Sequence, residues 1–186
     1  GLLEQKVFEV GWGPCLPLKN ELSQLRNSAR RFVFIGNDPW VKGLDLLLSA
    51  FQRVHNEYPD TRLDIIGINQ DQGSSYSVYG IHMHGPCPPN EVLQILTRSD
   101  ILVLPSRYER AGHVTIEAMW YGLPVIVSDI FGSPEPLLSG SCGIITTPGS
   151  IVDLTQAMLD LVEHPEIVMN MSEKAMVEAR RNWTWD

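Results

Sequence analysis

Short runs of apolar residues alternate along this chain with longer amphipathic stretches. The runs "RFVFIG", "RLDIIG", "ILVLPS" and "PVIVSD" are almost continuously hydrophobic, which is typical of strands buried on both faces of a sheet. The runs "IHMHG" and "GIITTP" predict two further strands with a weaker pattern. After the first strand, apolar residues recur at helical spacing, and Pro59 ends that stretch. These apolar positions are Leu44, Leu47, Leu48, Phe51 and Val54.

The remaining amphipathic stretches predict four more helices. One covers "PNEVLQILTRSD", one starts near Gly112 or His113, and two close the chain over "SIVDLTQAMLDLVEH" and "PEIVMNMSEKAMVEARRN". Buried strands that alternate with helices predict the α/β class, with a Rossmann-like, doubly wound parallel sheet. We expect one such domain over residues 1–186, with residues 1–30 as a lead-in segment.

One connection lacks a helical pattern. Residues 68–79, "INQDQGSSYSVY", are polar and rich in serine and glycine, yet just long enough to cross over to a parallel strand. We interpret the segment as a loop crossover. The alternative is a hairpin that leads to an antiparallel edge strand.

Composition narrows the classes of function. The chain has 186 residues, 44% of them hydrophobic, and a net charge of −8, which argues against a nucleic-acid-binding face or a polybasic membrane patch. Cys15, Cys87 and Cys142 lack metal-ligand spacing and predict reduced thiols in a cytoplasmic protein. No apolar run approaches the ~20 residues that span a bilayer. The opening "GLLEQKVFEVGWG" resembles the interior of a protein, so we expect a longer parent chain.

Glycine, proline and polar residues follow four of the predicted strands. They occur in "GNDPWVKG", "GPCPPN", "SRYERAGH" and "DIFGSPE". Because ligands of doubly wound sheets bind outside the carboxyl ends of the strands, these segments predict the rim of a binding cleft.

Two glutamates, Glu109 and Glu117, bracket the predicted start of the helix near Gly112. The unpaired amides and the dipole of a helix start favour a phosphate. Eight helical residues span about 12 Å, which is too far for two carboxylates that share one glycosidic bond. The spacing suits an extended ligand with hydroxyls at both ends and an anionic middle, such as a nucleotide-sugar. The alternative, and from spacing alone the commoner case, is that the acidic residues only complement the helix dipole.

Three segments together resemble one known family. They are "FIGNDPWVKGLDLLLSAF", "PSRYERAGHVTIEAMWYGLPVIVSD" with its Glu-x7-Glu element, and "FGSPEPLLSGSCGIITTPGSIVDLTQAMLDLVEHPE". From about Phe32 to Trp185, the chain resembles the C-terminal, nucleotide-sugar-binding domain of retaining group 1 glycosyltransferases of the GT-B fold. The third segment keeps the family register at Gly132, Glu135, Gly143, Pro148 and Gly149.

The resemblance implies roles for individual residues. Glu117 would accept hydrogen bonds from the nucleotide ribose, and Glu109 from hydroxyls of the donor sugar. The backbone of Gly112 and His113 would contribute amides to sugar and phosphate. Lys42 would neutralise the diphosphate leaving group.

The resemblance also places a nucleobase loop and shows one departure. Gly85 to Cys87 would contact the base, mainly through their backbone. Asn37 stands where the family usually has an arginine, which removes a positive charge from the diphosphate site. Arg107, Arg110 or a protonated His113 are the candidates to replace that charge.

The implied activity is transfer of a sugar from a nucleotide-sugar to an acceptor hydroxyl, without metal or other cofactor. Its partners would be an N-terminal domain of the same enzyme and a saccharide or lipid-linked acceptor; the latter would bring the enzyme to the inner membrane face. The isolated domain would transfer little or no sugar. Two alternatives stay open: a GT-B nucleotide-sugar epimerase, and a non-catalytic binding module, which Asn37 favours.

The other singled-out residues have commoner explanations. His82 and His84 share one face of a strand, but a metal site needs a third ligand, so packing or surface roles are more frequent. Cys87 lacks the partners of a nucleophile. Asp129 after its strand predicts a loop cap, and Trp183 and Trp185 predict packing of the last helix.

Overall fold

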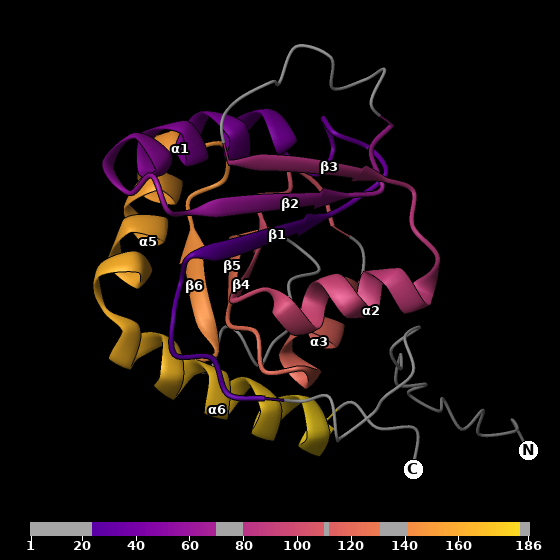
Figure 1. Cartoon of the computed structure of the whole chain (residues 1–186), viewed down its shortest axis with the longest axis vertical. Coiled ribbons are helices and arrows are strands. Elements are labelled where there is room, and N and C mark those ends of the chain that lie inside the picture. Colours follow the sequence, from indigo (N-terminus) through magenta and orange to yellow (C-terminus); the bar gives the residue numbers. More distant parts are fainter. Residues whose placement is uncertain (1–23, 70–79, 110–111, 131–140, 183–186) are drawn as a thin grey trace, which may run out of the picture.

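The computed structural model describes residues 24–69, 80–109, 112–130 and 141–182. The described strands form one six-stranded parallel sheet in the order β3-β2-β1-β4-β5-β6 (Figure 1). The strands are β1 (Arg31–Ile35), β2 (Arg62–Ile66), β3 (Ile81–Gly85), β4 (Ile101–Leu104), β5 (Val125–Ser128) and β6 (Gly143–Thr146). The helices are α1 (Leu44–Glu57), α2 (Pro89–Arg98), α3 (His113–Trp120), α5 (Ile151–Glu163) and α6 (Pro165–Asn182).

This strand order confirms the predicted doubly wound α/β fold. The chain runs outward from β1 to β3, returns to β4 beside β1, and then runs outward to β6. Helices α1 and α5 lie against each other on one face, and α2 and α3 lie on the other (Figure 1). Helix α6 packs against both α3 and α5. The carboxyl ends of β1 and β4 are adjacent at the reversal point, where such folds bind their ligands.

The connection between β2 and β3 leads to a parallel strand. Leu63 pairs with Ile81 and Asp64 with His82 in a parallel ladder, so the alternative of an antiparallel hairpin is wrong. Most of that connection, residues 70–79, lies outside the described residues.

The core occupies both faces of the central strands. Successive residues of a strand point to opposite faces, and Phe32, Val33 and Phe34 are all fully buried. The ring of Phe32 packs edge-on against Phe51 of α1, with 6.3 Å between the ring centroids. Phe32 therefore faces α1, and its neighbours Arg31 and Val33 face the side of the sheet on which α2 lies.

The described part of the lead-in segment, residues 24–30, packs against the domain. The backbone amide of Arg26 donates to Ser172 Oγ on α6 at 2.8 Å, and Ser172 Oγ in turn donates to the carbonyl of Gly122 at 2.6 Å. Burial lowers the pKa of Arg26 to about 10. Trp183 and Trp185, predicted to pack the last helix, lie outside the described residues. Among the described helices, none is long and apolar enough to cross a membrane.

Candidate functional site

The carboxyl ends of β1 and β4 bring Lys42 and Glu109 into an ion pair. Lys42 Nζ lies 2.6 Å from Glu109 Oε2, although 67 positions separate the two residues in the sequence. The Lys42 side chain is 22% exposed and that of Glu109 is 17% exposed. The pair is therefore half-sheltered from water but still accessible to a ligand.

The turn before α1 determines where Lys42 lies. Asp38 Oδ1 accepts hydrogen bonds from the amides of Trp40 and Val41, at 3.1 and 2.9 Å. Gly43 ends the turn with a φ of 70°, and a Cβ there would lie 2.0 Å from the carbonyl oxygen of Pro105. Only glycine fits so close a contact in this backbone conformation. The turn can thus lie directly against the loop that carries Glu109.

Arg107 joins the same two segments from the other side. Its guanidinium donates to both carboxylate oxygens of Asp45 at 2.7 Å, and to the carbonyl of Trp40 at 2.8 Å. The guanidinium carbon also lies 5.1 Å from the centroid of the Trp40 ring. The hydrogen bond from Arg107 lowers the pKa of Asp45. For Arg107 to serve as the expected extra diphosphate cation, this pairing with Asp45 would have to break.

Glu109 also connects Lys42 to the start of α3. The amide of Gly112 lies 3.4 Å from Glu109 Oε1, and Gly112 precedes the helix in a left-handed conformation with φ 58°. His113, the first residue of α3, is half-buried. Arg110 lies outside the described residues. The structure thus brings Glu109, Lys42 and Gly112 of the predicted site together.

Glu117 lies in the second turn of α3 and is only 6% exposed. A carboxylate at that depth is costly to bury unless polar groups surround it. The sequence placed Glu117 on the helix at the cleft but did not predict that it is buried.

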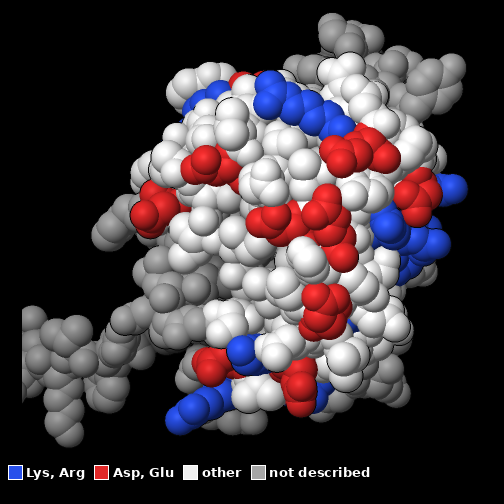
Figure 2. Space-filling model, turned by 90° about the vertical axis from the view of Figure 1, so that its left-hand side faces the viewer, with Lys and Arg blue, Asp and Glu red and all other residues white. Residues whose placement is uncertain are grey.

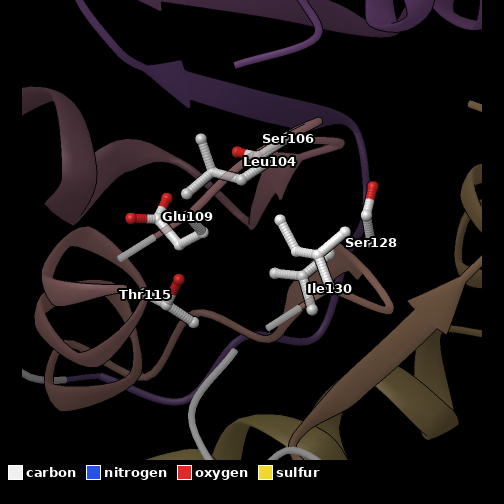
Figure 3. Close-up of a pocket in the computed structure, with 7 residues that line it drawn as sticks. Leu104, Ser106, Glu109, Thr115, Ser128 and Ile130 are labelled. Atoms are coloured by element: carbon white, nitrogen blue, oxygen red, sulfur yellow. The ribbon is translucent and has the colours of Figure 1, made fainter. Parts of the chain in front are cut away.

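A small pocket lies beside Glu109, and its lining includes the hydroxyl-bearing residues Ser106, Thr115 and Ser128 (Figure 3). The pocket has a volume of about 10 Å³, enough for roughly one water molecule. Its lining residues are Leu104, Ser106, Glu109, Thr115, Val127, Ser128 and Ile130. Ser106 is 2% exposed, and among the described residues its hydroxyl has no hydrogen-bond partner. Sequence reasoning included Ser106 only as part of the cleft rim, and its position directly after "ILVLP" was the available signal.

The predicted nucleobase loop lies at the edge of the sheet. Gly85 ends β3, and β2 and β1 lie between β3 and β4, the strand that leads to Glu109. The Gly85 carbonyl accepts from the amide of Gly67 at 2.7 Å. Cys87 is half-buried, and burial raises the pKa of its thiol. Asn37 is exposed and lies just after β1, in the same connection to α1 as Lys42.

The remaining candidates do not assemble a metal centre in the described part of the chain, where no three His, Cys, Asp or Glu side chains form a metal-binding group. His84 Nε2 lies 2.5 Å from Asp64 Oδ1, so this histidine has a carboxylate partner on the next strand. Asp129 is exposed, and its amide donates to the carbonyl of Thr146.

Comparison with known proteins places the chain in one class, the group 1 glycosyl transferases, which share the GT-B fold. Residues 20–177 match the family model described as glycosyl transferases group 1, and the chain belongs to that family. Over 167 residues it is 26% identical to a glycogen synthase from Mycobacterium tuberculosis, a match that covers 86% of this chain and 40% of that protein. The chain thus spans less than half the length of that relative.

Solved structures share the fold. The C-terminal domain of a group 1 glycosyl transferase (LpcC) from Francisella tularensis superposes with a TM-score of 0.74 at 18% identity, covering 86% of this chain and 89% of that domain. The Anabaena protein Alr3699/HepE, solved in complex with UDP and glucose, gives a TM-score of 0.72 at 20% identity. That match covers 83% of this chain and 45% of the other. This chain and the LpcC domain thus share one fold over most of their lengths.

Proposed function

We propose that this chain is the donor-binding domain of a retaining glycosyltransferase, which moves a sugar from a nucleotide-sugar to an acceptor hydroxyl. The observation that carries the proposal is the Lys42–Glu109 ion pair beside the start of α3, at the reversal point of the sheet. Membership of the group 1 family supports sugar transfer. The fold neighbour solved with UDP and glucose supports a nucleotide-sugar as the donor.

The donor would exchange partners with the ion pair. Its diphosphate binds Lys42 in place of Glu109, and the first amides of α3 donate to the phosphate oxygens. Glu109, released from Lys42, accepts hydrogen bonds from the sugar hydroxyls. When the bond from the anomeric carbon to phosphate breaks, negative charge develops on the departing diphosphate. Lys42 and the helix start stabilise that charge without a metal ion.

The rest of the donor extends along the carboxyl edge of the sheet. Glu117 accepts from the ribose once the donor displaces groups around it, and the backbone of Gly85 to Cys87 contacts the base. Asn37 donates a hydrogen bond where a second cation would be stronger, so binding of the diphosphate depends mainly on Lys42. His113 contributes its amide and, when protonated, a further positive charge.

Transfer itself would need a second domain. The match covers only 40% of the length of the curated relative, and an N-terminal domain would supply the acceptor site across the cleft. Departure of the diphosphate and entry of a saccharide or lipid-linked acceptor on the same face of the sugar would retain the anomeric configuration.

Product analysis of the full-length enzyme tests the proposal. A mixture of nucleotide-sugars and acceptors should yield a glycosylated acceptor with retained configuration. Lys42→Met should abolish transfer, whereas Lys174→Met, at an exposed lysine on α6, should leave it unchanged. Conversion of the nucleotide-sugar into its epimer, or equal activity in both variants, would contradict the proposal.

A further inference from the structure

A second polar cavity lies on the α2 side of the sheet, over β1, β2 and β3. It has a volume of about 280 Å³ and is lined by Arg31, Arg62, Asp64, His82, His84 and Arg98. Arg31 and Arg62 are the first residues of β1 and β2, and Arg98 is the last residue of α2. The cavity therefore extends from the amino ends of β1 and β2, which lie at the opposite edge of the sheet from the Lys42–Glu109 site, to His84 near the end of β3.

Strand register forces two of these arginines together. Arg31 and Arg62 are direct partners in the parallel ladder of β1 and β2, so their side chains leave the same face side by side. Like charges directly opposite each other on neighbouring strands destabilise a sheet. Arg98 adds a third positive charge nearby, because Arg31 Nη1 donates to the Arg98 carbonyl at 3.4 Å.

The carboxylates around the cavity already have other partners. Asp64, 9% exposed, pairs with His84, and Asp60 pairs with Arg30 at 3.4 Å. Asp100 Oδ2 accepts from two backbone amides, those of Arg30 and Arg31, at 3.0 Å each. Among the described residues, no carboxylate oxygen lies within 4 Å of the guanidinium nitrogens of Arg31, Arg62 or Arg98. The three arginines thus outnumber the two nearby carboxylates that lack an arginine partner, Asp64 and Asp100, which leaves an excess of positive charge.

This concentration of arginine contrasts with the rest of the surface. The chain has 14 lysine and arginine residues against 22 aspartate and glutamate residues, and three of the 14 line this one cavity. The face of the molecule that Figure 2 shows has acidic side chains across its middle and basic side chains mainly near its edges. A protein with a net charge of −8 has no general need for such a cluster, which a bound anion would neutralise.

We propose that this cavity binds the phosphate group of a small phosphorylated molecule, at a site separate from the nucleotide-sugar cleft. A planar guanidinium group can donate two parallel hydrogen bonds to two oxygens of one phosphate. His82, at the rim, offers a further hydrogen-bond donor. A volume of about 280 Å³ lies just below the usual range for small-molecule pockets, which suits inorganic phosphate or a compact phosphorylated molecule.

Titration with inorganic phosphate and pyrophosphate, followed by ¹H–¹⁵N NMR at constant ionic strength, tests this site. We expect saturable shifts of the Arg62, Asp64 and His82 amides. Arg62→Gln and Arg98→Gln should each weaken phosphate binding about tenfold. Arg53→Gln, which removes the same charge from an exposed position on α1, should leave it within about twofold. Lys42→Met should also leave these shifts intact, which separates the cavity from the donor cleft.

Three results would overturn the proposal. The first is shifts confined to the cleft around Lys42, and the second is an equal loss of binding in Arg53→Gln and Arg62→Gln. The third comes from co-sedimentation with phosphatidylcholine vesicles that contain phosphatidylglycerol. Arginine-dependent binding to these vesicles without any response to free phosphate would assign the arginines to a membrane surface.

Discussion

Lys42 Nζ and Glu109 Oε2 lie 2.6 Å apart and form an ion pair. In the proposed function, Lys42 would contact the diphosphate of the donor and Glu109 would contact its sugar. In the structure each side chain neutralises the other. In the proposed function, a nucleoside diphosphate would compete with Glu109 for Lys42, and a sugar would compete with Lys42 for Glu109. The ion pair would thus link binding of the two halves of the donor.

Glu109→Gln should strengthen binding of the diphosphate part of the donor and weaken binding of its sugar part. It releases Lys42 and removes a negative charge near the diphosphate, so the nucleoside diphosphate should bind about two- to fivefold more tightly, as expected for a partly exposed ion pair. The matching nucleotide-sugar should lose affinity relative to the diphosphate, because its hydroxyls lose a charged acceptor. Calorimetry on both ligands measures this ratio. Glu173→Gln, at an exposed site on α6, is the control, and an unchanged ratio in Glu109→Gln would contradict competition for Lys42.

Gly43→Ala should destabilise the chain more than Gly149→Ala. Both glycines have positive φ, 70° and 77°, so a side chain at either position costs about 1–2 kcal/mol of backbone strain. At Gly43 a Cβ would also meet the Pro105 carbonyl at 2.0 Å, whereas at Gly149 nothing lies within 4 Å. The added overlap should cost a further 1–3 kcal/mol or so. Urea unfolding of both variants isolates this difference, and equal losses would show that the turn does not lie tightly against Pro105.

Ser106→Ala should have little effect on the stability of the chain but should lower its affinity for the donor. Because the buried Ser106 hydroxyl lacks a partner among the described residues, its removal should leave the free energy of unfolding within about 1 kcal/mol of the original, or raise it. If the donor supplies the missing partner, affinity for it should fall by about 1 kcal/mol, roughly fivefold. Denaturation and donor titration of the same variant measure both quantities. A large loss of stability with unchanged affinity would contradict this assignment.

Asp45→Asn should reveal a pH-dependent contribution from the Arg107 pairing. The hydrogen bond from Arg107 lowers the pKa of Asp45 below its usual 3.8. As the pH falls, Asp45 is therefore protonated in the unfolded chain before it is protonated in the folded chain. The stabilisation by the Arg107–Asp45 pair is fully present above pH 3.8, the pKa of Asp45 in the unfolded chain, and it is lost as the pH falls through the lower pKa of the folded state. Near neutral pH the substitution should cost less than about 1 kcal/mol, because both side chains are partly exposed.

Chemical unfolding between neutral and acidic pH measures that cost. The difference between Asp45→Asn and the original chain should shrink below pH 3.8, and in an Arg107→Gln background it should be small throughout. A pH-independent difference, or one that survives in the Arg107→Gln background, would show that Asp45 acts by some other contact.

Most of the fold could be predicted from sequence because its signals are local. Helix α6 covers the predicted residues 165–182, because its amphipathic pattern and its end residues are clear. Strand β3 covers "IHMHG", although the pattern of that run is weaker. Strand β4 stops at Leu104, earlier than "ILVLPS" suggested, because Pro105 has no amide to continue a ladder. The parallel direction of β3 was only one of two alternatives, since the connecting loop has no pattern that decides it.

The candidate site was less predictable because its contacts join distant segments. Lys42 and Glu109 were both named, but nothing in the sequence shows that they pair across 67 positions. Arg107 was a candidate diphosphate cation, yet its bond with Asp45 depends on how the turn before α1 lies against the loop after β4. The burial of Glu117 and the environment of the Ser106 hydroxyl likewise depend on tertiary packing.

The most direct test of the central claim is calorimetric titration of this chain with UDP, GDP, ADP and their sugars, repeated on Glu117→Gln and Lys42→Met. We predict selective binding of one nucleotide and its sugar, and weaker binding in both variants, whose folding circular dichroism confirms. Equal binding of all nucleotides, or binding that neither substitution changes, would contradict a donor site at the start of α3.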